Sequence, residues 1–306
     1  MFCFIALIIF GIMGIFSASH RQLAKEAFAC VLRRITFRPC NVSFQEKAKG
    51  KILGWLLRKS PFLAKFFNKY FEVLSWIFFV LMMGSFAYGA YGAYNFYIYG
   101  SCNGPNSSGF CVFDPAGSSN KASTLDTKCY LNKPTEKDLD FSKLDLKDFP
   151  QRLNGASNNI IFVGCYACDY TRKAYPIIKN LLSKYNSNFT FVHFPVKAET
   201  TYLLNYDYCV YKESPDKYWQ YQSTLFNLDK YLLIDEPAIG NVLKELGFNA
   251  DKIKKCVLGS EAKSATAKRL DEIGNVGIYG TPTIWINGKI FVGPKPERVY
   301  RRALVK

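Results

Sequence analysis

The pattern of hydrophobic and polar residues divides the chain into two parts. Two long apolar runs near the start, residues 2–16 and 73–100, contain no charged residue. From about residue 135 onward, short apolar runs alternate with segments in which apolar residues recur every three or four positions. Uncharged runs of about 20 residues are typical of membrane-spanning helices, and the later alternation is typical of buried strands and amphipathic helices. We therefore predict two spans, residues 2–19 and 73–99, followed by an α/β domain.

Charge predicts the orientation of these spans. Residues 20–70 carry twelve Lys and Arg residues against two Glu, whereas residues 73–113 carry no charge. The positive-inside rule places this loop in the cytoplasm and the remainder of the chain outside. The loop accounts for most of the formal net charge of +16, so nucleic acid is not needed to explain it. Its aromatic residues, interleaved with cations over residues 49–71, suit either a lipid surface or a simple hairpin between spans.

The first run could instead be a cleaved signal peptide. No basic residue precedes it, however, and a signal peptide normally carries positive charge there. We therefore expect a retained anchor over residues 1–100, in a cell membrane, with the C-terminal part on the extracytoplasmic side.

Cysteine usage agrees with this topology. The chain has ten cysteines, and only Cys3, Cys30 and Cys40 fall on the membrane or inner side. Cys30 and Cys40 are either free thiols or part of an electron relay toward the exported side. The other seven suit an oxidising compartment; they are Cys102, Cys111, Cys129, Cys165, Cys168, Cys209 and Cys256. Because seven is odd, at least one thiol is free or pairs with another chain, and Cys129 is the candidate.

Residues 101–134 form a linker rich in Gly, Pro, Ser and Asn. This composition predicts an ordered turn region or a tether rather than a domain core. Cys102 and Cys111 could close part of it into a small loop.

The domain after the linker, residues 135–306, has a readable order of elements. Residues 158–164 and 189–196 read as buried strands, with an amphipathic helix between them that contains Pro176. Residues 198–275 read as several helices. The last segment, from residue 280, reads as strand, Asn-Gly turn, strand and basic helix.

Cys165 and Cys168, in "FVGCYACDYT", fall between the first strand and its helix. Such a pair can be a redox centre, half of a metal site, a structural disulfide or a coincidence. Zinc needs four ligands, but the chain has two His residues and no second CxxC, which disfavours it. A helix N-terminus stabilises a thiolate, so Cys165 is the expected nucleophile and Cys168, one turn along the helix, the resolving thiol.

Three stretches in this order, "FVGCYACDYTRKAYP", "CVYKESPDKYWQYQSTLF" and "YGTPTIWINGK", resemble the DsbA-like form of the thioredoxin fold over residues 135–306. The resemblance implies an α/β thioredoxin fold with a helical insertion. It implies that Thr281 and Pro282 face the cysteine pair through a cis bond that exposes backbone to a substrate chain. It also favours a disulfide between Cys209 and Cys256 over two buried thiols. No metal and no cofactor are implied.

The resemblance implies a membrane-anchored thiol-disulfide oxidoreductase for exported proteins, recycled by a separate membrane partner. The alternative is a peptide-binding or chaperone module whose CxxC disulfide is static. Tyr166 and Ala167 replace the Pro-His of strongly oxidising relatives and supply no cation, so we expect a less oxidising pair. Oxidation, isomerisation and reduction all remain open. His193 is expected to be a packed strand residue rather than a catalytic base.

Overall fold

The computed structural model describes residues 60–107, 109–124 and 139–305, with single residues or pairs between positions 25 and 58. The chain divides into two compact units, residues 1–90 and 91–306, and helix α4 (Pro61–Tyr99) contributes to both. Several predicted features lie outside the described residues: the span over residues 2–19 and the thiols of Cys3, Cys30, Cys40 and Cys129.

The predicted span over residues 73–99 falls within α4, so this segment is helical as expected. In the part of the chain that the structure describes, no helix combines the length and the apolar character needed to cross a membrane. The prediction of a span is therefore not supported. Toward its C-terminal end the run is diluted by Gly, Tyr and Asn residues, which lower its mean hydropathy.

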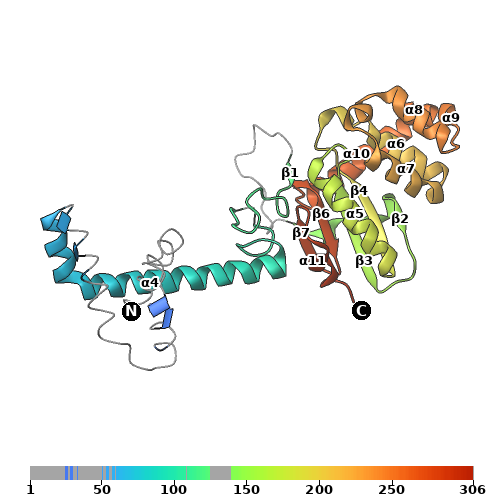
Figure 1. The fold of residues 1–306 in the computed structure, drawn as a ribbon. Helices are drawn as coiled ribbons and strands as arrows, with labels where there is room; N and C mark the ends of the chain where they lie inside the picture. Colours follow the sequence, from blue (N-terminus) through green and yellow to red (C-terminus); the bar gives the residue numbers. More distant parts are fainter. Residues whose placement is uncertain are drawn as a thin grey trace. The chain divides into compact units, whose positions relative to one another are not determined.

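The C-terminal unit is built on a five-stranded sheet with strand order β2-β4-β3-β6-β7 (Figure 1). The two predicted buried strands form its centre and run parallel to each other. Every other neighbouring pair is antiparallel. The strands are β2 (Gln151–Arg152), β3 (Asn158–Gly164), β4 (Ser187–His193), β6 (Thr283–Ile286) and β7 (Lys289–Val292).

The predicted Asn-Gly turn joins β6 to β7. Asn287 and Gly288 both have positive φ, 48° and 88°. Two-residue hairpin turns of this hand require positive φ at both positions, which Asn and Gly adopt most readily. A separate two-stranded ladder pairs β1 (Ser123–Thr124) with β5 (Gly280–Thr281), and no strand was predicted at β1.

Helices follow the predicted periodicity. α5 (Asp169–Lys184) connects β3 to β4 and contains Pro176. α11 (Glu297–Arg301) follows β7. The helical segment between β4 and β5 gathers at one end of the sheet (Figure 1). Its helices are α6 (Leu203–Glu213), α7 (Pro215–Asn227), α8 (Glu236–Glu245), α9 (Ala250–Leu258) and α10 (Ser260–Asn275).

Alternate residues of the central strands enter two separate cores, because successive side chains of a strand point to opposite faces. Ile160 and Phe162 of β3 join the larger core, which α5, α11 and the helical segment cover. Ile161 and Val163 join a smaller core on the other face, together with residues 139–149 and the end of α10. Burial on both faces explains why these strands are largely apolar in the sequence.

Candidate active site at the Cys165–Cys168 pair

The CxxC motif lies in the turn that joins β3 to α5. The amide of Cys168 donates to the carbonyl of Cys165 over 3.2 Å. The structure joins the two residues as a disulfide, with 5.3 Å between their Cα atoms. We predicted that Cys168 lies one turn along the helix, and this is wrong. Cys168 is the N-cap, with extended backbone (φ −91°, ψ 125°), and α5 begins at Asp169.

Gly164 lets this turn lie close to its neighbours. A Cβ at Gly164 would fall 2.8 Å from Cγ2 of Thr171 and 3.2 Å from the ring of Phe191. The hydroxyl of Thr171, in the first turn of α5, accepts a hydrogen bond from the amide of Cys165 over 3.4 Å. The first cysteine is thereby held against the positive end of the helix, where a thiolate is stabilised.

Tyr166, between the cysteines, points into the domain and is fully buried. Its hydroxyl donates to Oδ1 of Asp207 over 2.9 Å, and its ring lies 4.6 Å from the ring of His193 and 4.7 Å from that of Phe226. Burial, and then the Asp207 carboxylate, raise the pKa of Tyr166 well above its ordinary value. The phenol therefore stays protonated and remains a donor.

Asp207 is a buried carboxylate shared by two elements of the site. It lies on α6 with only 2% of its surface exposed, and its Oδ2 is 2.6 Å from Nδ1 of His193 at the end of β4. His193 pairs across the parallel ladder with Gly164, directly before the first cysteine. Tyr166, His193 and Asp207 thus form one hydrogen-bonded group beneath the CxxC turn. We call it the buried triad.

Sequence reasoning missed Asp207. The signal was present, because Asp207 lies among Leu203, Leu204 and Val210 on the apolar face of α6. A carboxylate at such a position needs a buried partner. His193 is packed in the strand, as expected, but it also bonds to Asp207.

Arg172 holds the backbone of the turn. Its Nε donates to the carbonyl of Tyr166 over 2.6 Å, and its Nη2 donates to the carbonyls of Leu225 and Leu228. Burial lowers the pKa of Arg172 from its ordinary value, but a guanidinium still stays charged. The turn is therefore joined to α7 through Arg172 and to α6 through the buried triad.

Thr281 and Pro282 lie near the disulfide in the fold, and the peptide bond between them is cis. The β3–β6 ladder pairs Val163 with Thr283, so Thr281 and Pro282, which directly precede β6, run toward Gly164 and Cys165. Thr281 is fully buried, and within the described residues its hydroxyl has no hydrogen-bond partner. Among the residues that the structure describes, two further disulfides join Cys102 to Cys111 and Cys209 to Cys256, the second linking α6 to α9.

Metal ligands do not gather at this site. Across the ranges that the structure describes, no group of three or more His, Cys, Asp or Glu residues could hold a metal ion.

A family model described as thioredoxin matches residues 154–306, which is half of the chain. The chain belongs to the thioredoxin family. The matched half contains the CxxC turn, the buried triad and the Thr281–Pro282 bond of this thioredoxin-family domain. No match was found among curated proteins.

Solved structures similar to this thioredoxin-family chain are distant from it in sequence. A thioredoxin-like oxidoreductase from Silicibacter pomeroyi DSS-3 is 16% identical, with a TM-score of 0.46 over 55% of this chain and 95% of that one. The thiol-disulfide exchange protein alpha-DsbA2 from Wolbachia pipientis is 16% identical, with a TM-score of 0.45 over 53% and 88%. Oxidised BdbD from Bacillus subtilis is 20% identical, with a TM-score of 0.43 over 52% and 90%.

Proposed function

We propose that this chain is a thiol-disulfide oxidoreductase acting on exported proteins, which we call clients. The observation that carries the proposal is the Cys165–Cys168 disulfide in the turn before α5. Two cysteines three positions apart can alternate between disulfide and dithiol while the sheet and helix around them stay in place.

The exchange proceeds in two balanced steps. In the reduced enzyme, the Cys165 thiolate attacks one sulfur of a client disulfide, forming a mixed disulfide and releasing the other client sulfur as a thiolate. The Cys168 thiolate then attacks the sulfur of Cys165, which restores the Cys165–Cys168 disulfide and releases the second client thiolate. The reverse sequence oxidises a client dithiol. A separate membrane partner would restore the starting state.

The direction of exchange depends on how well the Cys165 thiolate is stabilised. Tyr166 and Ala167 supply no cation, and Asp169 follows the motif, although Lys230 pairs with its carboxylate. We therefore place the reduction potential nearer the values of isomerases and reductases, about −180 to −270 mV, than the value of about −120 mV of a strong oxidase.

This proposal is tested by equilibrating the full chain in a dithiol redox series and tagging free thiols by mass. A Cys165→Ser/Cys168→Ser variant supplies the baseline, because the remaining cysteines titrate in both proteins. A potential near −120 mV would contradict the proposed direction. A CxxC pair that never titrates reversibly would contradict the activity itself.

Burial of the cysteines favours a second candidate, a peptide-binding module with a static disulfide. Cys165 is 0% exposed and Cys168 is 1% exposed. A disulfide covered on all sides cannot be attacked until something moves. In cells that need the protein, a Cys165→Ser variant that retains full function would favour this second candidate.

We also propose attachment to a lipid bilayer, with the thioredoxin-family domain on the extracytoplasmic side. Two disulfides besides the CxxC pair support an oxidising compartment. α4 supports lipid contact through large apolar side chains with at least half of their surface exposed, among them Trp76, Ile77, Val80, Leu81 and Phe86. The full chain is expected to stay in the membrane pellet after carbonate extraction, and its release would contradict the attachment.

A further inference from the structure

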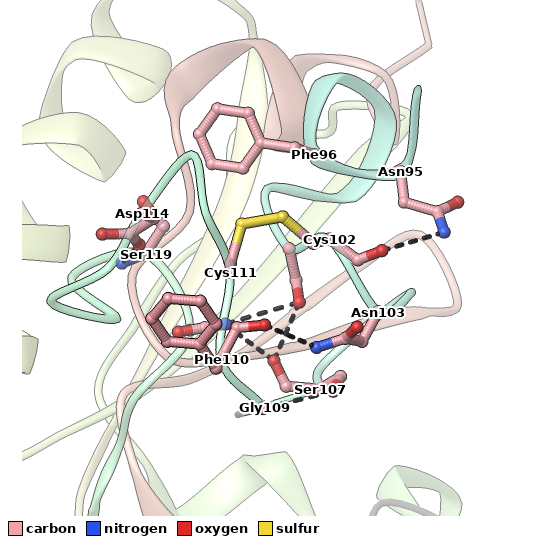
Figure 2. The surroundings of a disulfide bond; sticks show 12 residues. Asn95, Phe96, Cys102, Asn103, Ser107, Gly109, Phe110, Cys111, Asp114 and Ser119 are labelled. Carbon is pink, nitrogen blue, oxygen red and sulfur yellow. Dashed lines mark hydrogen bonds between the residues drawn. A yellow bond between two sulfur atoms is a disulfide. The ribbon is translucent and has the colours of Figure 1, made fainter. Parts of the chain in front are cut away.

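The segment before the domain is a folded structure rather than a tether. We call residues 100–107 and 109–124 the cap. The Cys102–Cys111 disulfide closes its first part, and the hydroxyl of Ser101 and the amide of Asn120 both donate to the carbonyl of Ser107 (Figure 2 shows the disulfide and Ser107). The carboxylate of Asp114 accepts hydrogen bonds from Ser118 and Ser119. These bonds give the cap a defined shape.

The cap is bonded to the edge of the sheet. The side-chain amide of Asn106 donates to the carbonyl of Ile290 over 3.0 Å and accepts from the amide of Val292 over 2.7 Å. One side chain thus satisfies a donor and an acceptor of edge strand β7, as a neighbouring strand would. Gly293 allows close contact here, since a Cβ at that residue would fall 2.8 Å from the carbonyl oxygen of Lys121.

The end of the cap forms a strand directly beside the cis bond. Ser123 pairs with Thr281 and Thr124 pairs with Gly280 in an antiparallel ladder. A Cβ at Gly280 would fall 2.9 Å from the carbonyl oxygen of Ser123, so the two backbones touch. Ala122 packs against the core cluster that contains Cys165 and Cys168.

We propose that the cap occupies the strand edge on which a client segment would pair, and that it shields the Cys165–Cys168 disulfide until β1 leaves β5. This inference rests on the proposed exchange activity and adds its regulation. A free strand edge accepts an extended chain through backbone hydrogen bonds. Here the edge of β5 is already paired with β1, and the disulfide beside it is buried.

The size of the contact makes the occupation reversible. Within the described part of the chain, β1 pairs with β5 through two residues, whereas β3 and β4 pair through seven. Short, peripheral ladders open far more often than central ones. If only the open form reacts, the client reacts in proportion to the open fraction, so a pairing that is open about one tenth of the time slows exchange about tenfold.

The test compares two variants of the full chain that differ in backbone pairing. Ser123→Pro/Thr124→Pro removes both amide donors of β1, whereas Ser123→Ala/Thr124→Ala changes only side chains. The probe is an extended synthetic peptide with one reduced cysteine. Its thiolate attacks the sulfur of Cys165, forms a peptide–Cys165 disulfide and releases Cys168 as a thiolate, which mass spectrometry detects.

We expect the proline variant to form this mixed disulfide about tenfold faster than the parent, and the alanine variant to stay within about twofold. A third variant, Cys102→Ser/Cys111→Ser, loosens the cap without touching β1, and its rate of mixed-disulfide formation is expected to rise as well. Equal rates for the parent and the proline variant would overturn the shielding. So would an equal rise in the alanine variant, because the backbone ladder would then not be the cause.

The failure of the proposed function is a different outcome. In that case dithiothreitol reduces Cys165–Cys168, but the peptide forms no mixed disulfide with the parent or with any variant, even at high concentration. Circular dichroism and an intact Cys209–Cys256 disulfide confirm that each variant is folded.

Discussion

Replacing Asp207 by Ala should destabilise the domain strongly, because the buried triad depends on this carboxylate. Without it, the hydroxyl of Tyr166 and Nδ1 of His193 both lose their partner in a fully buried site. Each unsatisfied buried group costs about 1–3 kcal/mol, and removing one partner of a buried ionic group costs about 3–5 kcal/mol. We therefore expect Asp207→Ala to lower the free energy of unfolding by about 3–5 kcal/mol.

The assay is urea denaturation of the oxidised full chain, followed by circular dichroism. Asp271→Ala is the matched control, because Asp271 lies exposed on α10 and its loss should change the free energy of unfolding by less than about 0.5 kcal/mol. Tyr166→Phe removes a single hydrogen bond to a charged group and should cost about 1.5–3 kcal/mol.

A double-mutant cycle tests the linkage directly. If Tyr166 acts through Asp207, the effects of Tyr166→Phe and Asp207→Ala should be non-additive by about 0.5–3 kcal/mol. Strict additivity, or a loss below about 1 kcal/mol for Asp207→Ala, would refute the reasoning, since either result would mean that the carboxylate is not the shared acceptor.

Three further predictions concern stability and pH. Cys209→Ala/Cys256→Ala removes a disulfide that closes a loop with a sequence separation of 47. Chain entropy then predicts that the free energy of unfolding falls by about 4 kcal/mol in the same urea assay. A fall below about 1 kcal/mol would contradict a stabilising role for this disulfide. Gly164→Ala should lower the free energy of unfolding by about 1–3 kcal/mol, because the added methyl group overpacks against Thr171. An unchanged urea midpoint would show that the turn can accommodate this methyl group. Partial burial acts to raise the pKa of Asp114, but hydrogen bonds from Ser119 and Ser118 outweigh it and hold that pKa below its ordinary value. The stabilisation is then complete above about pH 4 and lost as the pH falls further, so amide protection in the cap should drop there in the parent and not in Asp114→Asn.

The central strands could be predicted because their signal is local. β3 and β4 are buried on both faces, so their sequences are largely apolar and can be recognised without knowledge of the rest of the fold. Cys168 was placed inside the helix rather than at its N-cap, because an N-cap and a helical residue differ only in backbone geometry, which residue type specifies weakly.

The pairing of the cap with the strands β5 and β7 could not be predicted for a different reason. The Gly, Pro, Ser and Asn residues of the cap read as a loop, and its structure depends on partners about 160 to 190 positions away, such as Thr281 and Val292. A pairing of two residues leaves no periodic pattern in the sequence. The partnership of Tyr166 with Asp207, 41 positions apart, is equally non-local.

The inward orientation of Tyr166 has a consequence for protein engineering. The two residues between the cysteines of a CxxC motif are a natural target for substitutions that change its redox potential. In this chain, replacing Tyr166 by Pro would leave Oδ1 of Asp207 without its hydrogen-bond donor in a buried site, while Oδ2 keeps its contact with His193. A different pair of residues between the cysteines would therefore need a compensating substitution at Asp207 on α6. Redox properties in this chain thus depend jointly on two segments that are distant in the sequence.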